Sequence, residues 1–253
     1  MQTSLRPSYA ICRVRLPVCH RARQMLLGAL FGTLTMLSAG TPTVFAAEPN
    51  VVLPAPTFDE PAGTSHRELA VLAGGCFWGV QGVFQHVRGV IEVVAGYSGG
   101  TAETAQYETV STGTTGHAES VAIEFDPTKI SYGRLLQIYF SVALDPTQVG
   151  GQGPDRGPQY RSAIFPTSPM QERVALHYIE QLQQTHQFSR PLTTRVSAYK
   201  GFYAAEAYHQ NYLTLHPDDV YIAINDIPKV EHLQRLFPQV YLAKPVLVQL
   251  AGE

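Results

Sequence analysis

Residues 69–79 read Leu-Ala-Val-Leu-Ala-Gly-Gly-Cys-Phe-Trp-Gly, and this stretch decides the centre of the fold. Five apolar residues lead into two glycines, and apolar residues then recur at helical spacing from Val80 to Val87. The pattern predicts a strand, a glycine turn and a helix that begins near Cys76. The positive end of the helix dipole favours an anion there, so we expect the Cys76 thiol to be partly ionised and reactive. The alternative is a small, buried apolar side chain.

The first 46 residues have the three parts of an export signal. Arginines precede an uncharged apolar run at 25–37, and small residues follow at 46–47. The apolar run is shorter than the roughly 20 residues that span a bilayer, so we expect no stable membrane span. We predict a cleaved signal over residues 1–46 and export to the bacterial periplasm, with an uncleaved membrane anchor as the alternative. Residues 47–66 contain four prolines and are predicted to be an extended linker, with the folded domain starting near His66.

Cleavage of the signal would change the cysteine content. Cys12 and Cys19 lie in the part that would be removed, which leaves Cys76 as the one cysteine of the mature chain. Structural cysteines of exported proteins normally occur in pairs, so an unpaired thiol favours a chemical role over a structural one.

Further along the chain, short apolar runs alternate with helical patterns. Ser131 and Ser168 are the expected N-caps of two helices. We predict a mixed sheet with helices packed on it, which is a two-layer α+β sandwich with a ferredoxin-like core and the cysteine at a strand-to-helix turn. Strands are expected at 90–95, 118–125, 162–165 and 193–197, and a further helix at 204–215.

Two glycine-containing segments bring further polar and aromatic residues. One runs from Tyr107 to Glu119, and the other contains Asp155 and ends in Tyr160 just before a predicted strand. Glycines beside polar residues are typical of loops that approach a ligand closely. Taken singly, each segment could equally be a surface turn.

The motif Gly-Cys-Phe-Trp-Gly at 75–79 resembles the signature of the A-type peptide methionine sulfoxide reductases, and the two later segments match that family in order and spacing over residues 69–215. The resemblance implies a catalytic domain at 67–243. It also implies reduction of the S epimer of methionine sulfoxide, free or in oxidised proteins and peptides, without a cofactor. Cys76 would be the attacking thiolate and Glu119 the proton donor.

The resemblance also assigns a substrate pocket. It implies that Tyr107, Asp155 and Tyr160 hold the sulfoxide oxygen and the surrounding waters. Phe77 and Trp78 would enclose the S-methyl group, and an aromatic floor suits a small apolar group.

The chemistry of a sulfoxide supports this assignment of an acid and a nucleophile. Its sulfur is a poor electrophile until the oxygen is protonated or hydrogen-bonded. Glu119 could donate that proton if burial raised its pKa from about 4.3 toward neutrality. The products would be methionine and the sulfenic acid of Cys76.

This chain departs from many relatives in its C-terminal segment. Residues 218–253 contain no cysteine that could resolve the sulfenic acid, so an external thiol, either small or thioredoxin-like, would have to reduce it. Leu144 also stands before Asp-Pro where the family pattern leads us to expect histidine.

Composition and spacing also bear on other classes of protein. With 18 Lys and Arg against 20 Asp and Glu, nothing indicates a nucleic-acid partner. A cysteine hydrolase could use His117 or His209 as its base, although we expect His117 to have a structural hydrogen-bonding role. No pair of cysteines or histidines has the spacing of a zinc site, so we expect no metal. A non-catalytic binding module is a further alternative, but it would not need a reactive thiol. We expect the protein to be a monomer.

Overall fold

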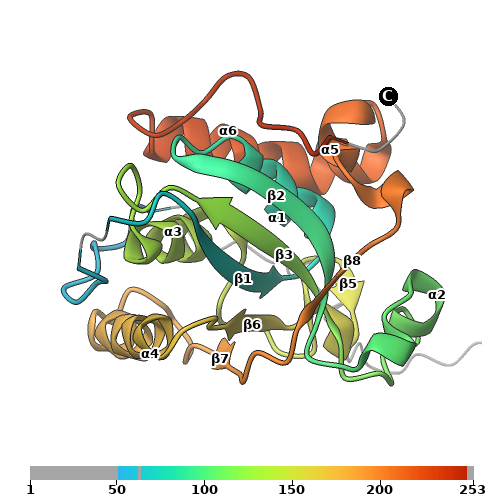
Figure 1. Ribbon diagram of the computed structural model, residues 1–253, viewed down its shortest axis with the longest axis horizontal. Helices are drawn as coiled ribbons and strands as arrows, with labels where there is room; N and C mark the ends of the chain where they lie inside the picture. The colour runs from blue at the N-terminus through green and yellow to red at the C-terminus, as the bar shows by residue number, and fades with distance from the viewer. Residues whose placement is uncertain (1–50, 62–63, 250–253) are drawn as a thin grey trace, which may run out of the picture. The chain divides into compact units, whose positions relative to one another are not determined.

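The computed structural model describes residues 51–61 and 64–249 (Figure 1). Its main sheet has six strands in the order β7-β6-β1-β3-β2-β8, all paired antiparallel except β6 and β7. β4 and β5 form a separate two-stranded antiparallel sheet. The mixed sheet with packed helices is as predicted.

The strands are β1 Glu68–Gly74, β2 Val90–Ser98, β3 Ala118–Phe125, β4 Gly151–Gln152, β5 Asp155–Arg156, β6 Ser162–Phe165, β7 Arg195–Val196 and β8 Phe202–Ala204. The α-helices are α1 Phe77–Gln85, α2 Tyr107–Val110, α3 Tyr132–Ile138, α4 Pro169–Gln184, α5 Tyr212–Leu215 and α6 Ile227–Leu236. Shorter helical segments are η1 Ala102–Thr104, η2 Tyr139–Ala143, η3 Pro158–Tyr160, η4 Ala207–His209 and η5 Ile222–Asp226.

The strand, turn and helix around Cys76 lie at the centre of this sheet. β1 is hydrogen-bonded to β3 on one side and to β6 on the other, and α1 packs back on β1, β2 and β3 (Figure 1). Gly75 has φ +92°, a left-handed conformation that favours glycine, and a Cβ there would collide with the side chain of Gln152. The turn therefore brings Cys76 to the edge where β1 ends.

Both faces of the central strands are apolar. Leu72, Val121 and Ile123 belong to the main core beneath the helices. Val71 and Ala122 belong to a smaller cluster on the opposite face. Two buried faces explain why the runs at 69–73 and 118–125 are nearly continuously apolar.

Both predicted helix caps are present. The Ser131 side chain accepts a hydrogen bond from the backbone N–H of Arg134, and Ser168 does the same for Gln171. The helix that Ser131 caps, α3, continues directly into η2, a π-helical segment. These caps are local features, which is why the sequence pattern locates them correctly.

The helix predicted at 204–215 is wrong. The chain instead forms the end of β8, the short turn η4 and the single-turn helix α5. Gln210 is drawn into the sheet, where its side chain bonds both the N–H and the C=O of Ala95, and Asn211 adopts a left-handed φ of 58°. The strand predicted at 193–197 forms only as β7, Arg195–Val196.

The described part of the predicted linker, residues 51–61, is extended but packs on the domain. Leu53 is 4% exposed and joins the main core, and its N–H donates to Ser141 Oγ at 3.2 Å. The carboxylate of Asp59 accepts hydrogen bonds from Ser131 Oγ at 2.6 Å and from the Gly133 N–H at 2.9 Å. The packed structure thus begins well before His66, because apolar burial and a helix cap hold this segment against α3.

The predicted export signal at 1–46, together with Cys12 and Cys19, lies outside the described residues. Within residues 51–61 and 64–249, no helix has the length and apolar character needed to cross a membrane.

Candidate active site

Cys76 is the N-cap residue of α1 and is 8% exposed. The Trp78 backbone N–H lowers the pKa of its thiol. The strand-to-helix turn therefore places the thiol as predicted, beside the free N–H groups of the first helical turn.

Glu119, the second residue of β3, lies against the same helix end. Its Oε2 accepts a hydrogen bond from the Phe77 N–H at 3.0 Å, and the residue is 4% exposed. Burial raises the pKa of Glu119 to about 8, although the Phe77 hydrogen bond opposes the rise. At neutral pH the carboxyl is mostly protonated, which is the state a proton donor needs.

The ionisation of Cys76 differs from the sequence-based expectation. Burial raises the pKa of its thiol well above the usual range, and the negative charges of Glu119 and Asp226 raise it further. The Trp78 backbone N–H and the charge of Lys229 lower the pKa but do not offset these effects. The free enzyme therefore holds a neutral thiol, because loss of water outweighs the favourable helix end.

The predicted polar residues gather around this pair. The charge of Glu119 raises the pKa of both Tyr107 and Tyr160, after the larger effect of burial, so both hydroxyls remain protonated donors. Asp155 in turn raises the pKa of Glu119. Asp155 is itself held by the Tyr221 hydroxyl, which donates to its Oδ2 at 2.6 Å.

The two aromatic residues after Cys76 have different surroundings. Phe77 belongs to the main core, where its ring lies 5.0 Å from that of His209. Trp78 is partly exposed and stacks on Tyr212, with ring centroids 3.9 Å apart and an interplanar angle of 10°. The Trp78 Nε1–H also donates to His209 Nδ1 at 3.2 Å. Trp78 is thus fixed from both sides before any substrate binds.

Four residues of this site were missed from the sequence, and all come from the C-terminal part of the chain. Tyr212 lies in the helix predicted at 204–215, and the other three lie in the segment 218–253, where no local pattern indicates contact with Cys76. A possible signal was the Asp-Ile-Pro-Lys run at 226–229, because residues three apart on a helix are neighbours. The four are Tyr212, Tyr221, Asp226 and Lys229.

The two histidines considered as bases have hydrogen-bond partners other than the thiol. His117 Nδ1 accepts from the Gly100 N–H at 3.2 Å, and its Nε2 lies 2.9 Å from the Thr101 carbonyl, which confirms the structural role expected for it. His209 supports Trp78, and burial lowers its pKa. Among the described residues, no group of three potential ligands could hold a metal ion.

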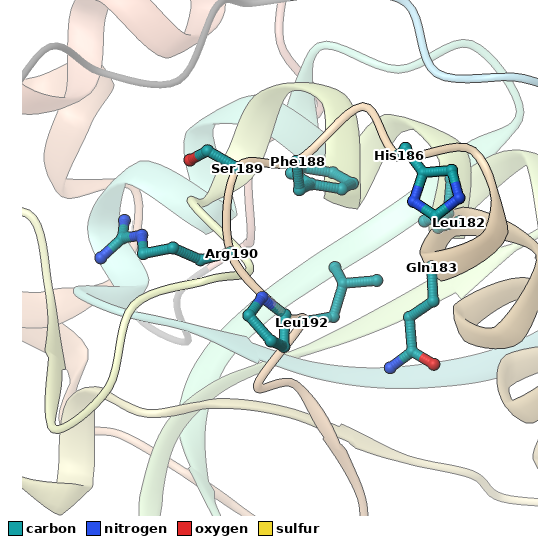
Figure 2. Close-up of a pocket in the computed structure, with 8 residues that line it drawn as sticks. Leu182, Gln183, His186, Phe188, Ser189, Arg190 and Leu192 are labelled. Carbon is teal, nitrogen blue, oxygen red and sulfur yellow. The ribbon is translucent and has the colours of Figure 1, made fainter.

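A cavity of about 460 Å³ lies at the end of α4 (Figure 2). Leu182, Phe188 and Leu192 form its apolar part, with His186 and Arg190 at its border. None of the predicted site residues lines it. The cavity is therefore not the candidate active site.

A mixed α+β fold that buries a thiol beside a protonated carboxyl and tyrosine hydroxyls fits the class of cysteine-dependent reductases. A family model described as peptide methionine sulfoxide reductase matches residues 68–240. The chain belongs to this family, and the resemblance seen in the sequence is confirmed. It is an A-type enzyme that reduces methionine sulfoxide to methionine.

Relatives and solved structures agree with this assignment. The chain is 57% identical to peptide methionine sulfoxide reductase MsrA 2 of Mesorhizobium japonicum, over 73% of this chain and 95% of the relative. It is 50% identical to MsrA 2 of Synechocystis sp., over 74% of this chain and 88% of the relative. The structure is similar to reduced Mxr1 from Saccharomyces cerevisiae, with TM-score 0.55 and 30% identity over 62% of this chain and 90% of that one. Methionine sulfoxide reductase A of Corynebacterium diphtheriae gives TM-score 0.53 and 30% identity, over 68% of this chain and 86% of that one.

Proposed function

We propose that Cys76 attacks the sulfur of methionine (S)-sulfoxide while Glu119 protonates its oxygen. In the net reaction the S–O bond of the substrate breaks and an S–O bond forms on Cys76. The substrate sulfur gains two electrons and leaves as methionine, and the cysteine sulfur loses two electrons and becomes a sulfenic acid. The observation that carries this proposal is the position of Glu119, a buried carboxyl with a pKa of about 8 at the helix end that also holds the thiol.

The substrate would be held by the neighbouring side chains. The hydroxyls of Tyr107 and Tyr160 remain protonated and can donate to the sulfoxide oxygen, and Asp155 orders the polar side of the site. Phe77 and Trp78 supply the apolar surface for the S-methyl group. Recognition would be confined to the sulfoxide and its methyl group, which suits both free and peptide-bound substrates.

An external thiol would complete the cycle. Cys76 is the one free cysteine among the described residues, so no disulfide partner lies near it there. If residues 1–46 are removed, Cys12 and Cys19 leave with them and the sulfenic acid must wait for a donor. In a periplasm small thiols are scarce, so we propose a thioredoxin-like or membrane-delivered donor. We also propose that the enzyme is a monomer.

A turnover experiment without reductant tests this scheme. The exported protein receives an excess of racemic methionine sulfoxide together with dimedone, and the products are separated on a chiral column. We expect one methionine per enzyme, consumption of the S epimer alone, and a dimedone adduct on Cys76 but not on the Cys76→Ser variant. Two methionines per enzyme would show a second redox equivalent in the chain and would contradict the single-cysteine scheme. Mass spectrometry of the same sample reports whether residues 1–46 are absent.

A further inference from the structure

A buried ion pair lies against the first turn of α1, and the reaction proposed above does not use it. Asp226, at the end of η5, has no exposed surface, and its Oδ1 accepts a hydrogen bond from Lys229 Nζ at 2.9 Å. The Lys229 side chain is 21% exposed. A Cβ on Gly79 would collide with Asp226 Oδ1 and with Lys229 Nζ, so the pair occupies the space that this glycine leaves free.

Stability does not explain this arrangement. The second carboxylate oxygen, Asp226 Oδ2, is buried and has no hydrogen-bond partner among the described residues. Burying a carboxylate that is only partly satisfied costs several kcal/mol, and apolar residues of similar volume are often neutral or stabilising in place of a buried ion pair. A costly charge beside the first turn of the helix that bears Cys76 points to a role at the thiol.

The charges that face Cys76 come from three different elements. Glu119 lies on β3, Asp226 on η5 and Lys229 on α6. The negative charge of Asp226 raises the pKa of the thiol, and the positive charge of Lys229 lowers it by a smaller effect. Asp226 also raises the pKa of Glu119. The other titratable groups that interact with the thiol are the hydroxyls of Tyr107, Tyr160, Tyr212 and Tyr221.

We propose that Asp226 and Lys229 are a positioning pair that keeps the Cys76 sulfur in its protonated thiol form until substrate fills the site. Asp226 supplies the restraining charge. Burial raises the pKa of Asp226, and Lys229 opposes that rise and so favours the ionised carboxylate. When the sulfoxide oxygen is protonated, positive charge on the substrate sulfur favours the thiolate and overcomes the restraint. This inference rests on the proposed role of Cys76 as the nucleophile.

The restraint would protect the resting enzyme. Peroxide oxidises thiolates far faster than thiols, and further oxidation to the sulfinic acid is irreversible. No second cysteine among the described residues could intercept the sulfenic acid. Keeping Cys76 protonated therefore limits its loss under the oxidising conditions in which methionine sulfoxide forms.

The test is the pH dependence of iodoacetamide alkylation, followed by mass spectrometry of the Cys76 peptide in the full chain. Asp226→Asn leaves Lys229 as an unopposed positive charge, and the double variant Asp226→Asn/Lys229→Gln removes both charges. We expect the apparent pKa of Cys76 to be highest in the wild type, intermediate in the double variant and lowest in Asp226→Asn. Alkylation at pH 7 should be about 10-fold faster in Asp226→Asn than in the wild type, the change that one pKa unit produces. The exposed Asp218→Asn is the matched control and should leave the rate unchanged.

The order of the apparent pKa of Cys76 in the wild type, Asp226→Asn and the double variant decides the outcome. A purely structural role would give no reversal when Lys229→Gln is added to Asp226→Asn, and that result would overturn the proposal. An unchanged or higher pKa in Asp226→Asn would also overturn it. If the asparagine variant does not fold, as judged by circular dichroism, Asp226→Ser replaces it in both backgrounds. Peroxide should inactivate Asp226→Asn about 10-fold faster than the wild type, in line with the larger thiolate fraction.

This test is independent of the catalytic assignment. Alkylation reports the charge around Cys76 whether or not that residue is the nucleophile. If the expected order appears but Cys76→Ser still reduces methionine sulfoxide, the proposed mechanism fails and the electrostatic role of the pair stands.

Discussion

The backbone N–H of Phe77 donates to Glu119 Oε2 across 3.0 Å, which ties the first residue of α1 to the second residue of β3. A free N–H of the helix end therefore holds the acid, while Cys76 is the N-cap residue of the same helix. The thiol and the acid thus lie at the same end of one helix. This relationship is the basis of the first two predictions.

Replacing Glu119 by glutamine removes the transferable proton but keeps the shape of the side chain. We expect the rate of sulfoxide reduction to fall by about 100-fold or more, with little change in substrate binding. Single-turnover kinetics and equilibrium binding measure the two quantities separately. Glu124→Gln, on the same strand but partly exposed, is the control and should be nearly as active as the wild type. Near-normal activity of Glu119→Gln would transfer the acid role to a tyrosine or to water.

The pH dependence of kcat/KM should report both groups. The reactive form needs Cys76 ionised and Glu119 protonated, and the pKa of Glu119, about 8, lies below that of the thiol. We therefore expect kcat/KM to rise with pH up to about 8, because more thiolate forms, and then to level off, because the gain in thiolate is cancelled by loss of the protonated acid. In Glu119→Gln the rise should continue beyond pH 8. A wild-type profile that still rises steeply at pH 9 would contradict the assignment.

The hydrogen bond from Tyr221 to Asp155 should contribute to substrate positioning. Tyr221→Phe removes the donor to a charged acceptor, and we expect kcat/KM for a methionine sulfoxide peptide to fall about 10-fold. Steady-state kinetics measure this loss. Tyr199→Phe, at an exposed tyrosine remote in sequence from these loops, should behave as the wild type. Equal effects of the two variants would remove Asp155 from the site.

Leu53 should anchor the segment 51–61. Leu53→Ala leaves a cavity in the main core, and we expect the free energy of unfolding to fall by about 2–5 kcal/mol. The matched control, Val51→Ala, alters an exposed residue of the same segment and should change the free energy of unfolding by less than about 0.5 kcal/mol. Urea denaturation compares the two variants. A similar, small effect of both would mean that this segment behaves as the linker predicted from the sequence.

Glu60 should make the stability of the protein depend on pH. Burial, followed by the charge of Glu68, raises its pKa to about 7. Because the pKa is raised in the folded state, the stabilising contribution is complete below about pH 4.5 and is lost as pH rises through about 7. The melting temperature of Glu60→Gln should therefore rise relative to the wild type between pH 5 and pH 8. Glu180→Gln, at an exposed carboxylate, should show no such relative change.

Local patterns predicted much of this fold. The strand, turn and helix around Cys76 follow from an apolar run, two glycines and helical periodicity, and the caps at Ser131 and Ser168 need only a neighbouring N–H. The mixed sheet could be inferred because its buried central strands appear in the sequence as nearly continuous apolar runs. The proximity of Cys76 and Glu119, by contrast, was predicted from the family resemblance. No local pattern relates the N-cap of one helix to a residue on a distant strand.

The sequence by itself determined where the thiol lies in the fold, and only the tertiary structure decided its chemical state. A helix N-terminus is a local property, but the pKa of Cys76 depends on burial and on Asp226, which is distant in the chain. The same distinction explains the failed helix at 204–215, where Gln210 bonds to Ala95 instead of continuing a helical pattern. Periodicity and capping act over a few residues, whereas desolvation, charge and side-chain hydrogen bonds act between segments that only folding brings together.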